Sequence, residues 1–255
     1  MTFEYIGIDE AIARDGLRMV VVGGVPSSWG EAAKGFFHIK RIPWVATRLV
    51  YDSEPLAAWA GQLSAPIVAF DDEPRLSGWQ EILMLAERLE PVPSLLPESP
   101  ADRERAIELS AKFCAPNGLG WMRRLQVVHA GLAKVGGFSE RVAGYLGKKY
   151  GYTPEVGASA GARTRELLDA FGSTLRARRS AGSAYYFDAL SAVDVYSATF
   201  MAMFKPLPEA DCAMTPGIRA AFEWLDAETA AAIDPILFEH RDMMYARHLE
   251  LPLSL

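Results

Sequence analysis

In the first part of the chain, short apolar runs alternate with segments whose apolar side chains recur at helical spacing. Residues 17–22 form an apolar run interrupted only by an arginine, and a pair of glycines follows. This pattern is typical of a buried strand that stops at a turn. Apolar side chains at helical spacing then predict a helix over residues 31–40. A proline ends that helix, residues 44–50 are predicted as a second strand, and residues 52–63 as a short, ambiguous element.

A third strand and a longer helix follow. Residues 67–70, Ile-Val-Ala-Phe, open directly after Pro66 and predict a short strand. An acidic turn over residues 71–74 leaves room for a short hairpin strand. Residues 78–89 carry their apolar side chains on one helical face. The first two strands can be parallel through the helical crossover, and the third pairs through a turn, which predicts an α/β unit.

Composition changes at residues 91–100, where four prolines in ten residues exclude a continuous helix or a central strand. Beyond this segment no strand-like alternation stands out. We therefore predict an α/β domain over residues 1–91, a linker over 92–100 and an all-helical domain over 101–255. The candidate helices of the last domain are residues 102–114, 121–134, 139–150, 161–178, 191–204 and 215–225.

The charge balance restricts the classes of partner. The chain has 255 residues, 26 basic and 32 acidic side chains, and a net charge of −6. A general nucleic-acid binder needs a basic face that displaces phosphate counterions, so we expect no nucleic-acid partner. No segment has the apolar length of a membrane span, and acidic residues interrupt the N-terminal region where a secretory signal would be apolar. We expect no membrane partner either.

Cysteine and histidine usage predicts no metal site. The two cysteines, Cys114 and Cys212, are far apart, which disfavours a disulfide scaffold, a zinc ribbon and dithiol redox chemistry. They are predicted to be ordinary thiols of a cytoplasmic protein. His240 and His248 have no third ligand at metal spacing and are predicted to lie on the surface.

The dipeptide Ala65-Pro66 precedes the third strand. A cis bond there would turn the N–H and C=O of Ala65 away from the sheet, where an extended dipeptide could pair with them as an added strand. A trans proline that merely starts the strand is the expectation from frequencies, because only about 5–6% of X–Pro bonds in folded proteins are cis.

Two serine motifs mark helix starts. Ser77 and Gln80 have the spacing of a capping box, which marks the start of a helix. The N–H groups at that helix start would suit a bound carboxylate, or the box does no more than begin the helix. Ser27 and Ser28 lie between the first strand and the first helix. A hydroxyl there can stabilise a thiolate and lower the pKa of the thiol, or simply cap the helix.

A third box, Ser191-Ala192-Val193-Asp194, is predicted to be structural. The Asp194 carboxylate can accept from the N–H of Ser191 while the serine hydroxyl satisfies the N–H of Asp194. The following segment is apolar almost all round, so it is expected in the core of the helical domain.

Taken together, the order of elements, the proline-rich linker and two of these motifs resemble the cytosolic glutathione S-transferases. That family has a thioredoxin-like N-terminal domain and an all-helical C-terminal domain, and the resemblance covers about residues 17–225. The matching motifs are Ala65-Pro66 at the family's cis-proline, Ser191-Ala192-Val193-Asp194 at its buried capping box, and Ile42-Pro43-Trp44 at the entry to its second strand.

This resemblance implies a homodimeric enzyme that transfers the thiolate of glutathione to a small hydrophobic electrophile. Ser27, or failing it Ser28, would stabilise the sulfur, and Ala65 would pair with the backbone of glutathione. Lys34 matches a basic position of the family's first helix. The other implied site residues are Pro66, Ser77, Gly78 and Trp79 around glutathione, and Trp29, Trp121 and Arg124 in the electrophile pocket.

One departure from the family pattern keeps other functions open. Gly78-Trp79 stands where the family has an acidic residue or Gln followed by Ser, the groups that bind the γ-glutamyl end of glutathione. This favours a rival, a non-catalytic small-molecule-binding protein on the same fold. A glutathione-dependent isomerase or ether-cleaving enzyme would have the same sequence features. The pair Arg123-Arg124 either binds an anionic second substrate or forms a solvated helix face.

Overall fold

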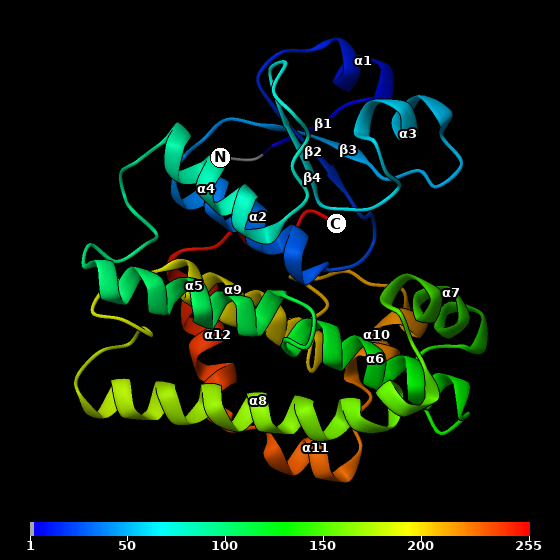
Figure 1. The fold of residues 1–255 in the computed structure, drawn as a ribbon, viewed down its shortest axis with the longest axis vertical. Coiled ribbons are helices and arrows are strands. Elements are labelled where there is room, and N and C mark those ends of the chain that lie inside the picture. Colours follow the sequence, from blue (N-terminus) through cyan, green and yellow to red (C-terminus); the bar gives the residue numbers. More distant parts are fainter. Residues whose placement is uncertain (1–2) are drawn as a thin grey trace.

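A four-stranded mixed sheet forms the first part of the molecule (Figure 1). The computed structural model describes residues 3–255. The strands lie in the order β1-β3-β2-β4. Strand β3 is parallel to both β1 and β2, and β4 is antiparallel to β2. The strands are β1 (Glu4–Tyr5), β2 (Leu17–Val21), β3 (Val45–Arg48) and β4 (Ile67–Phe70).

Helices cover both faces of this sheet. The central strand β2 is buried at all five positions, and its sequence is apolar except at the buried Arg18. Met19 packs in the core beneath α2 and α4, whereas Val20 packs with α3 on the opposite face. These helices are α2 (Ser28–Ile39), α3 (Glu54–Ala60) and α4 (Trp79–Leu89). The predicted α/β unit is confirmed, with the thioredoxin-like arrangement that the resemblance implies.

Two details of the sheet differ from the expectation. Strand β1 and helix α1 (Ile8–Ala13) were not predicted, because a two-residue strand carries no readable alternation. The hairpin strand expected after the acidic turn is reduced to one antiparallel bridge between Val68 and Leu76.

Helix α4 begins one residue later than the predicted capping box requires. Gly78 occupies the N-cap, and its N–H donates to the Glu81 carboxylate at 3.0 Å. The predicted pairing of Ser77 with Gln80 is therefore wrong. An ionised carboxylate is the stronger acceptor, and the positive end of the helix dipole favours its charge there.

The second part of the molecule is helical, and no strand is found there within the described residues. Helix α9 is buried at every position and packs against α2, α5 and α12, so it links the two parts. The predicted 161–178 helix extends over residues 154–180, because Thr153 caps it and Pro154 begins it. The helices are α5 (Pro100–Cys114), α6 (Leu119–Leu132), α7 (Glu140–Tyr150), α8 (Pro154–Ser180), α9 (Ala192–Phe200), α10 (Pro216–Glu223), α11 (Ala227–Ala232) and α12 (Pro235–Arg247).

The predicted capping box at the start of α9 is confirmed and belongs to a larger buried network. One oxygen of the Asp194 carboxylate accepts from the Ser191 N–H at 2.9 Å and from its hydroxyl at 2.7 Å. The other accepts from the Tyr186 N–H at 2.9 Å and lies 3.0 Å from His240 Nε2. His240 is buried, so its predicted surface position is wrong. Its imidazole is needed to satisfy a carboxylate that is fully enclosed.

No helix within residues 3–255 combines the length and the apolar character that crossing a bilayer requires.

Candidate functional site

A cleft of about 460 Å³ opens between the sheet unit and helices α6 and α7. Its lining comes from the start of α2, from the segment that enters β4, from Ser77, which precedes the N-cap of α4, and from the helical part. A cavity of this size is within the range that binds small molecules. The lining residues are Trp29, Gln62, Leu63, Ser64, Ala65, Pro66, Ser77, Trp121, Tyr145, Lys149 and Tyr150.

The backbone of Ala65 lies at this cleft. The Ala65–Pro66 bond is cis, so the trans expectation from frequencies is wrong and the geometry implied by the family resemblance is present. Strand β4 begins two residues later, at Ile67. Neither the N–H nor the C=O of Ala65 makes a hydrogen bond with any residue of the described range 3–255. Ala65 is half-buried, so among residues 3–255 its amide and carbonyl have no partner and are available to an extended ligand.

Trp29 joins the sheet unit to the helical part at one side of the cleft. Its indole Nε1–H donates to the Cys114 carbonyl at 3.1 Å, and its ring meets Phe200 edge to face at a centroid distance of 5.0 Å. Gly120 on α6 leaves the space for this contact, because a Cβ there would lie 2.8 Å from Trp29 Cη2 and closer still to Phe200. The position of Trp29 therefore depends on a glycine in the facing helix.

We expect Gly120→Ala to lower the free energy of unfolding by about 1–3 kcal/mol, as overpacking of a well-filled core does. Urea unfolding followed by circular dichroism measures the change. Gly144→Ala on α7 is the matched control, since a Cβ there meets no heavy atom within 4 Å. The control should be neutral or slightly stabilising because alanine is the better helix former. Equal stability of Gly120→Ala and the unaltered protein would contradict the close packing around Trp29.

The opposite wall of the cleft comes from α6 and α7. The Trp121 indole N–H donates to the Tyr150 carbonyl at 3.2 Å, and the two rings pack edge to face at 4.8 Å. Tyr145 contacts Tyr51, in the loop after β3, edge to face at 5.8 Å. Burial and the neighbouring Tyr145 raise the pKa of Tyr51 to about 12, so its hydroxyl is protonated at neutral pH. The sequence analysis missed Tyr145, Lys149 and Tyr150, which are spaced as a solvated face of α7.

The two candidate hydroxyls lie at the start of α2, next to Trp29, and neither lines the cleft. Ser27 is the N-cap of α2 and is half-buried, and its side chain makes no hydrogen bond within residues 3–255. Ser28 is fully buried, and its Oγ also has no partner in that range. Only the Ser27 hydroxyl is both unpaired and accessible to a ligand.

Gly78 and Trp79 also lie outside the cleft lining. The Trp79 ring packs edge to face on Tyr196 of α9 at 5.9 Å, and its carbonyl accepts from the Tyr196 hydroxyl at 3.1 Å. The indole thus stabilises the contact between the two parts of the molecule. Ser77 is the residue of this group that reaches the cleft.

The two adjacent arginines of α6 have different roles. Arg123 is fully buried and donates to the Met203 carbonyl at 3.0 Å and to the Gln126 side chain at 2.9 Å, which makes it structural. Arg124 is half-buried and makes no ion pair within residues 3–255. Its guanidinium lies over the ring of Tyr150, a residue of the cleft wall.

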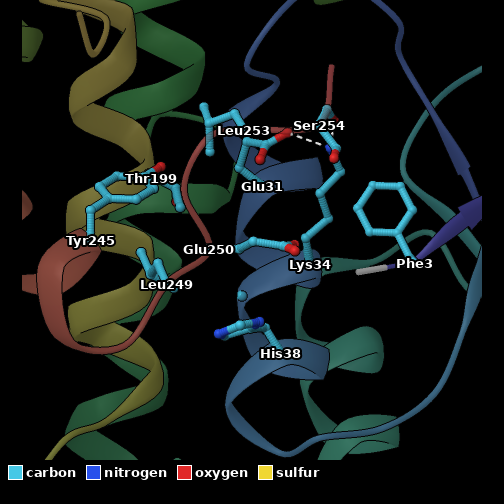
Figure 2. A pocket seen from close by; sticks show the side chains of 11 residues that line it. Phe3, Glu31, Lys34, His38, Thr199, Tyr245, Leu249, Glu250, Leu253 and Ser254 are labelled. Carbon is cyan, nitrogen blue, oxygen red and sulfur yellow. Dashed lines mark hydrogen bonds and ion pairs between the residues drawn. The ribbon is translucent and has the colours of Figure 1, made fainter. Parts of the chain in front are cut away.

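Lys34 is not available to a ligand. Figure 2 shows it on α2 facing the segment 249–254, where its ammonium pairs with Glu31 at 2.8 Å and donates to the Ser254 carbonyl at 2.7 Å. The cavity there is about 20 Å³, which leaves room for about one water molecule. Burial raises the pKa of Glu31, while the charge of Lys34 opposes that shift. The pair stabilises the docking of the C-terminal segment on α2.

A second large cleft, of about 500 Å³, is a weaker candidate. It lies between the proline-rich segment and the loop before α9. Its arginines are paired with carboxylates, Arg178 with Asp188 at 2.5 Å and Arg105 with Asp102 at 3.5 Å. Those pairs satisfy its charges internally, whereas the cleft at Ala65 has free backbone groups and an unpaired lysine.

Neither cysteine is a nucleophile in the folded protein. Burial raises the pKa of the Cys114 thiol well above its usual value, and it raises that of Cys212 to about 11. We expect no alkylation by iodoacetamide at neutral pH in the native protein and alkylation of both thiols after denaturation, as counted by mass spectrometry. A thiol that reacts in the native state would contradict this and would reopen cysteine chemistry.

Solved structures with the same fold include three bacterial glutathione transferases. One from Methylobacterium radiotolerans, in complex with glutathione sulfonate, has a TM-score of 0.61 at 14% identity and covers 94% of this chain and 97% of its own. One from Methylobacillus flagellatus with glutathione bound has a TM-score of 0.62 at 13% identity, covering 91% and 96%. A family member from Pseudomonas fluorescens with two glutathione molecules bound has a TM-score of 0.61 at 12% identity, covering 91% and 89%.

No protein-family model matches the sequence, and no curated protein matches it. At identities of 12–14% the likeness shows the fold, a thioredoxin-like domain followed by a helical domain as in the glutathione transferases. A fold hosts several chemistries, so the activity depends on the residues of the cleft.

Proposed function

We propose that this protein binds glutathione in the cleft at Ala65 and transfers its thiol to a small electrophile. The observation that carries the proposal is the free amide and carbonyl of Ala65, half-buried at the cleft with no partner among residues 3–255. These groups suit the extended backbone of a tripeptide, which would add to the sheet edge through main-chain hydrogen bonds. Solved structures of the same fold that hold glutathione support this assignment.

In the proposed reaction, the thiolate sulfur donates an electron pair to an electrophilic carbon. A C–S bond forms, the leaving group departs with the electron pair of its own bond, and the thiol proton passes to solvent. Ser27 would donate its hydroxyl to the sulfur, and the N-terminal end of α2 would favour the negative charge. Both effects lower the pKa of the bound thiol and raise the fraction of thiolate at neutral pH.

Isothermal calorimetry with glutathione tests this function. We expect heat of binding with glutathione and none with cysteine, because the free amino acid lacks the flanking peptide groups that pair with Ala65. Absence of heat at millimolar glutathione would overturn the proposal.

The rival is a non-catalytic small-molecule-binding protein on the same fold. The observation that favours it is the start of α4, where Gly78 and Trp79 provide no polar side chain for a γ-glutamyl group. This rival function predicts no heat of binding with glutathione and binding of an apolar ligand in the cleft. A glutathione-dependent isomerase or ether-cleaving enzyme would instead bind glutathione but give no stable conjugate.

We also propose a homodimer in the cytoplasm, as for the family that the chain resembles. Light scattering that gives twice the chain mass would support the dimer, and a monomeric mass would overturn it.

A further inference from the structure

Two basic side chains beside the cleft have no acidic partner among residues 3–255. Lys149, near the C-terminal end of α7, lines the cleft, and Arg124 on α6 lies behind Tyr150. Neither forms an ion pair with a carboxylate within residues 3–255, whereas thirteen other lysines and arginines of that range do. Helices α6 and α7, which carry these two residues, pack against each other (Figure 1).

Arg124 is held in place by aromatic rings instead of carboxylates. Its guanidinium lies 5.3 Å from the ring centroid of Phe222, 5.6 Å from that of Phe138 and 5.9 Å from that of Tyr150. Its Nε is buried and has no hydrogen-bond partner within the described chain. The stacking fixes the position of the charge and leaves it without a neutralising partner.

The charges of Arg124 and Lys149 act on each other. Partial burial lowers the pKa of the Lys149 ammonium, and the positive charge of Arg124 lowers it further. Two like charges near an aromatic wall raise the electrostatic potential of that end of the cleft. An anion bound there would relieve the repulsion between the two charges and raise the pKa of the lysine again.

Aromatic side chains gather in the cleft beside Lys149. Trp29 and Trp121 line it, and so do Tyr145 and Tyr150, which lie on α7 with the lysine. Aromatic walls of this kind favour a planar apolar molecule by stacking and area burial. The cleft therefore offers an aromatic slot with a positive charge at one end.

We propose that the second substrate is a planar aromatic molecule with an anionic group, a carboxylate or sulfonate, and that Lys149 binds this group with Arg124 supporting the charge from behind Tyr150. The choice of substrate rests on the proposed function, because that function assigns this end of the cleft to the electrophile. The anion site itself does not depend on glutathione.

A pair of fluorescent ligands tests the site directly. Anilinonaphthalene sulfonate is a planar aromatic anion, and phenylnaphthylamine has the same rings without the sulfonate. Both are titrated without glutathione into the unaltered protein, Lys149→Met, Lys149→Arg and Lys148→Met. Lys148 is the matched control, because it is exposed on the same helix, carries the same charge and does not line the cleft.

We expect Lys149→Met to bind the sulfonate about tenfold more weakly, as loss of one charged hydrogen bond does, with phenylnaphthylamine changed by less than about twofold. Lys149→Arg should retain sulfonate binding, and Lys148→Met should alter neither ligand. Unchanged sulfonate affinity in Lys149→Met would overturn the proposal, and so would an equal loss for both ligands. Circular dichroism checks that each variant is folded.

The two proposals fail in different ways. If glutathione gives heat of binding and Lys149→Met binds the sulfonate unchanged, the anion site is wrong and the transferase function stands. If Lys149→Met selectively loses sulfonate binding and glutathione gives no heat of binding, the anion site stands and the transferase function is wrong.

Discussion

Replacing Asp194 with alanine is expected to lower the free energy of unfolding by about 3–5 kcal/mol, because several buried donors lose their acceptor at about 1–3 kcal/mol each. Its carboxylate is fully enclosed and satisfies the Ser191 N–H and hydroxyl, the Tyr186 N–H and the His240 ring. Alanine would leave these donors buried without an acceptor, each at a cost in free energy. Urea unfolding followed by circular dichroism measures the difference.

Asp188→Ala is the control for this prediction. That aspartate pairs with Arg178 but is completely exposed, so its loss should leave the urea midpoint almost unchanged. Asp194→Asn should fall between the two, because the amide can still accept at one atom. A midpoint of Asp194→Ala equal to that of the unaltered protein would show that the buried network does not stabilise the start of α9.

Replacing Ser27 with alanine is expected to reduce kcat/KM for conjugation of glutathione with chlorodinitrobenzene by about 100-fold, comparable to the loss of one donor to a developing anion. The pH profile should shift upward at the same time, because the bound thiol would lose a hydrogen bond that favours its ionised form. Rates measured across pH separate this effect from a loss of folded protein.

Ser28→Ala is the informative comparison. Its hydroxyl is fully buried without a partner in the described chain, so it has no route to a ligand in this conformation. An unchanged rate in Ser27→Ala would contradict the role of Ser27. A loss confined to Ser28→Ala would assign the role to Ser28 and would require α2 to begin in a different conformation.

The parts of the fold that were predicted correctly are those with a strong local signal. Strand β4 was predicted at its observed bounds, since residues 67–70 are a continuous apolar run after a proline. The Asp194 capping box was readable because its two partners are three residues apart. Strand β1 was missed because a two-residue strand depends on pairing with β3, which no local pattern records.

The residues of the site were harder to predict from the sequence. The cleft brings Trp29, Ala65, Ser77 and Trp121 together; local motifs pointed to Ala65 and Ser77, and the family resemblance was the basis for selecting the two tryptophans. Lys149 has the spacing of a solvated helix face, and only the packing of α7 against α6 turns it toward the cleft. Contacts between distant segments decide such positions, so periodicity cannot reveal them.

A crystal structure of the protein soaked with glutathione tests the central claim most directly. We predict that the cysteinyl unit of glutathione pairs with the N–H and C=O of Ala65 at about 2.8–3.1 Å, with its sulfur directed toward Ser27. The γ-glutamyl carboxylate should lie beside Ser77 and the first N–H groups of α4. A tripeptide bound elsewhere, or a cleft without glutathione at millimolar concentration, would contradict the account.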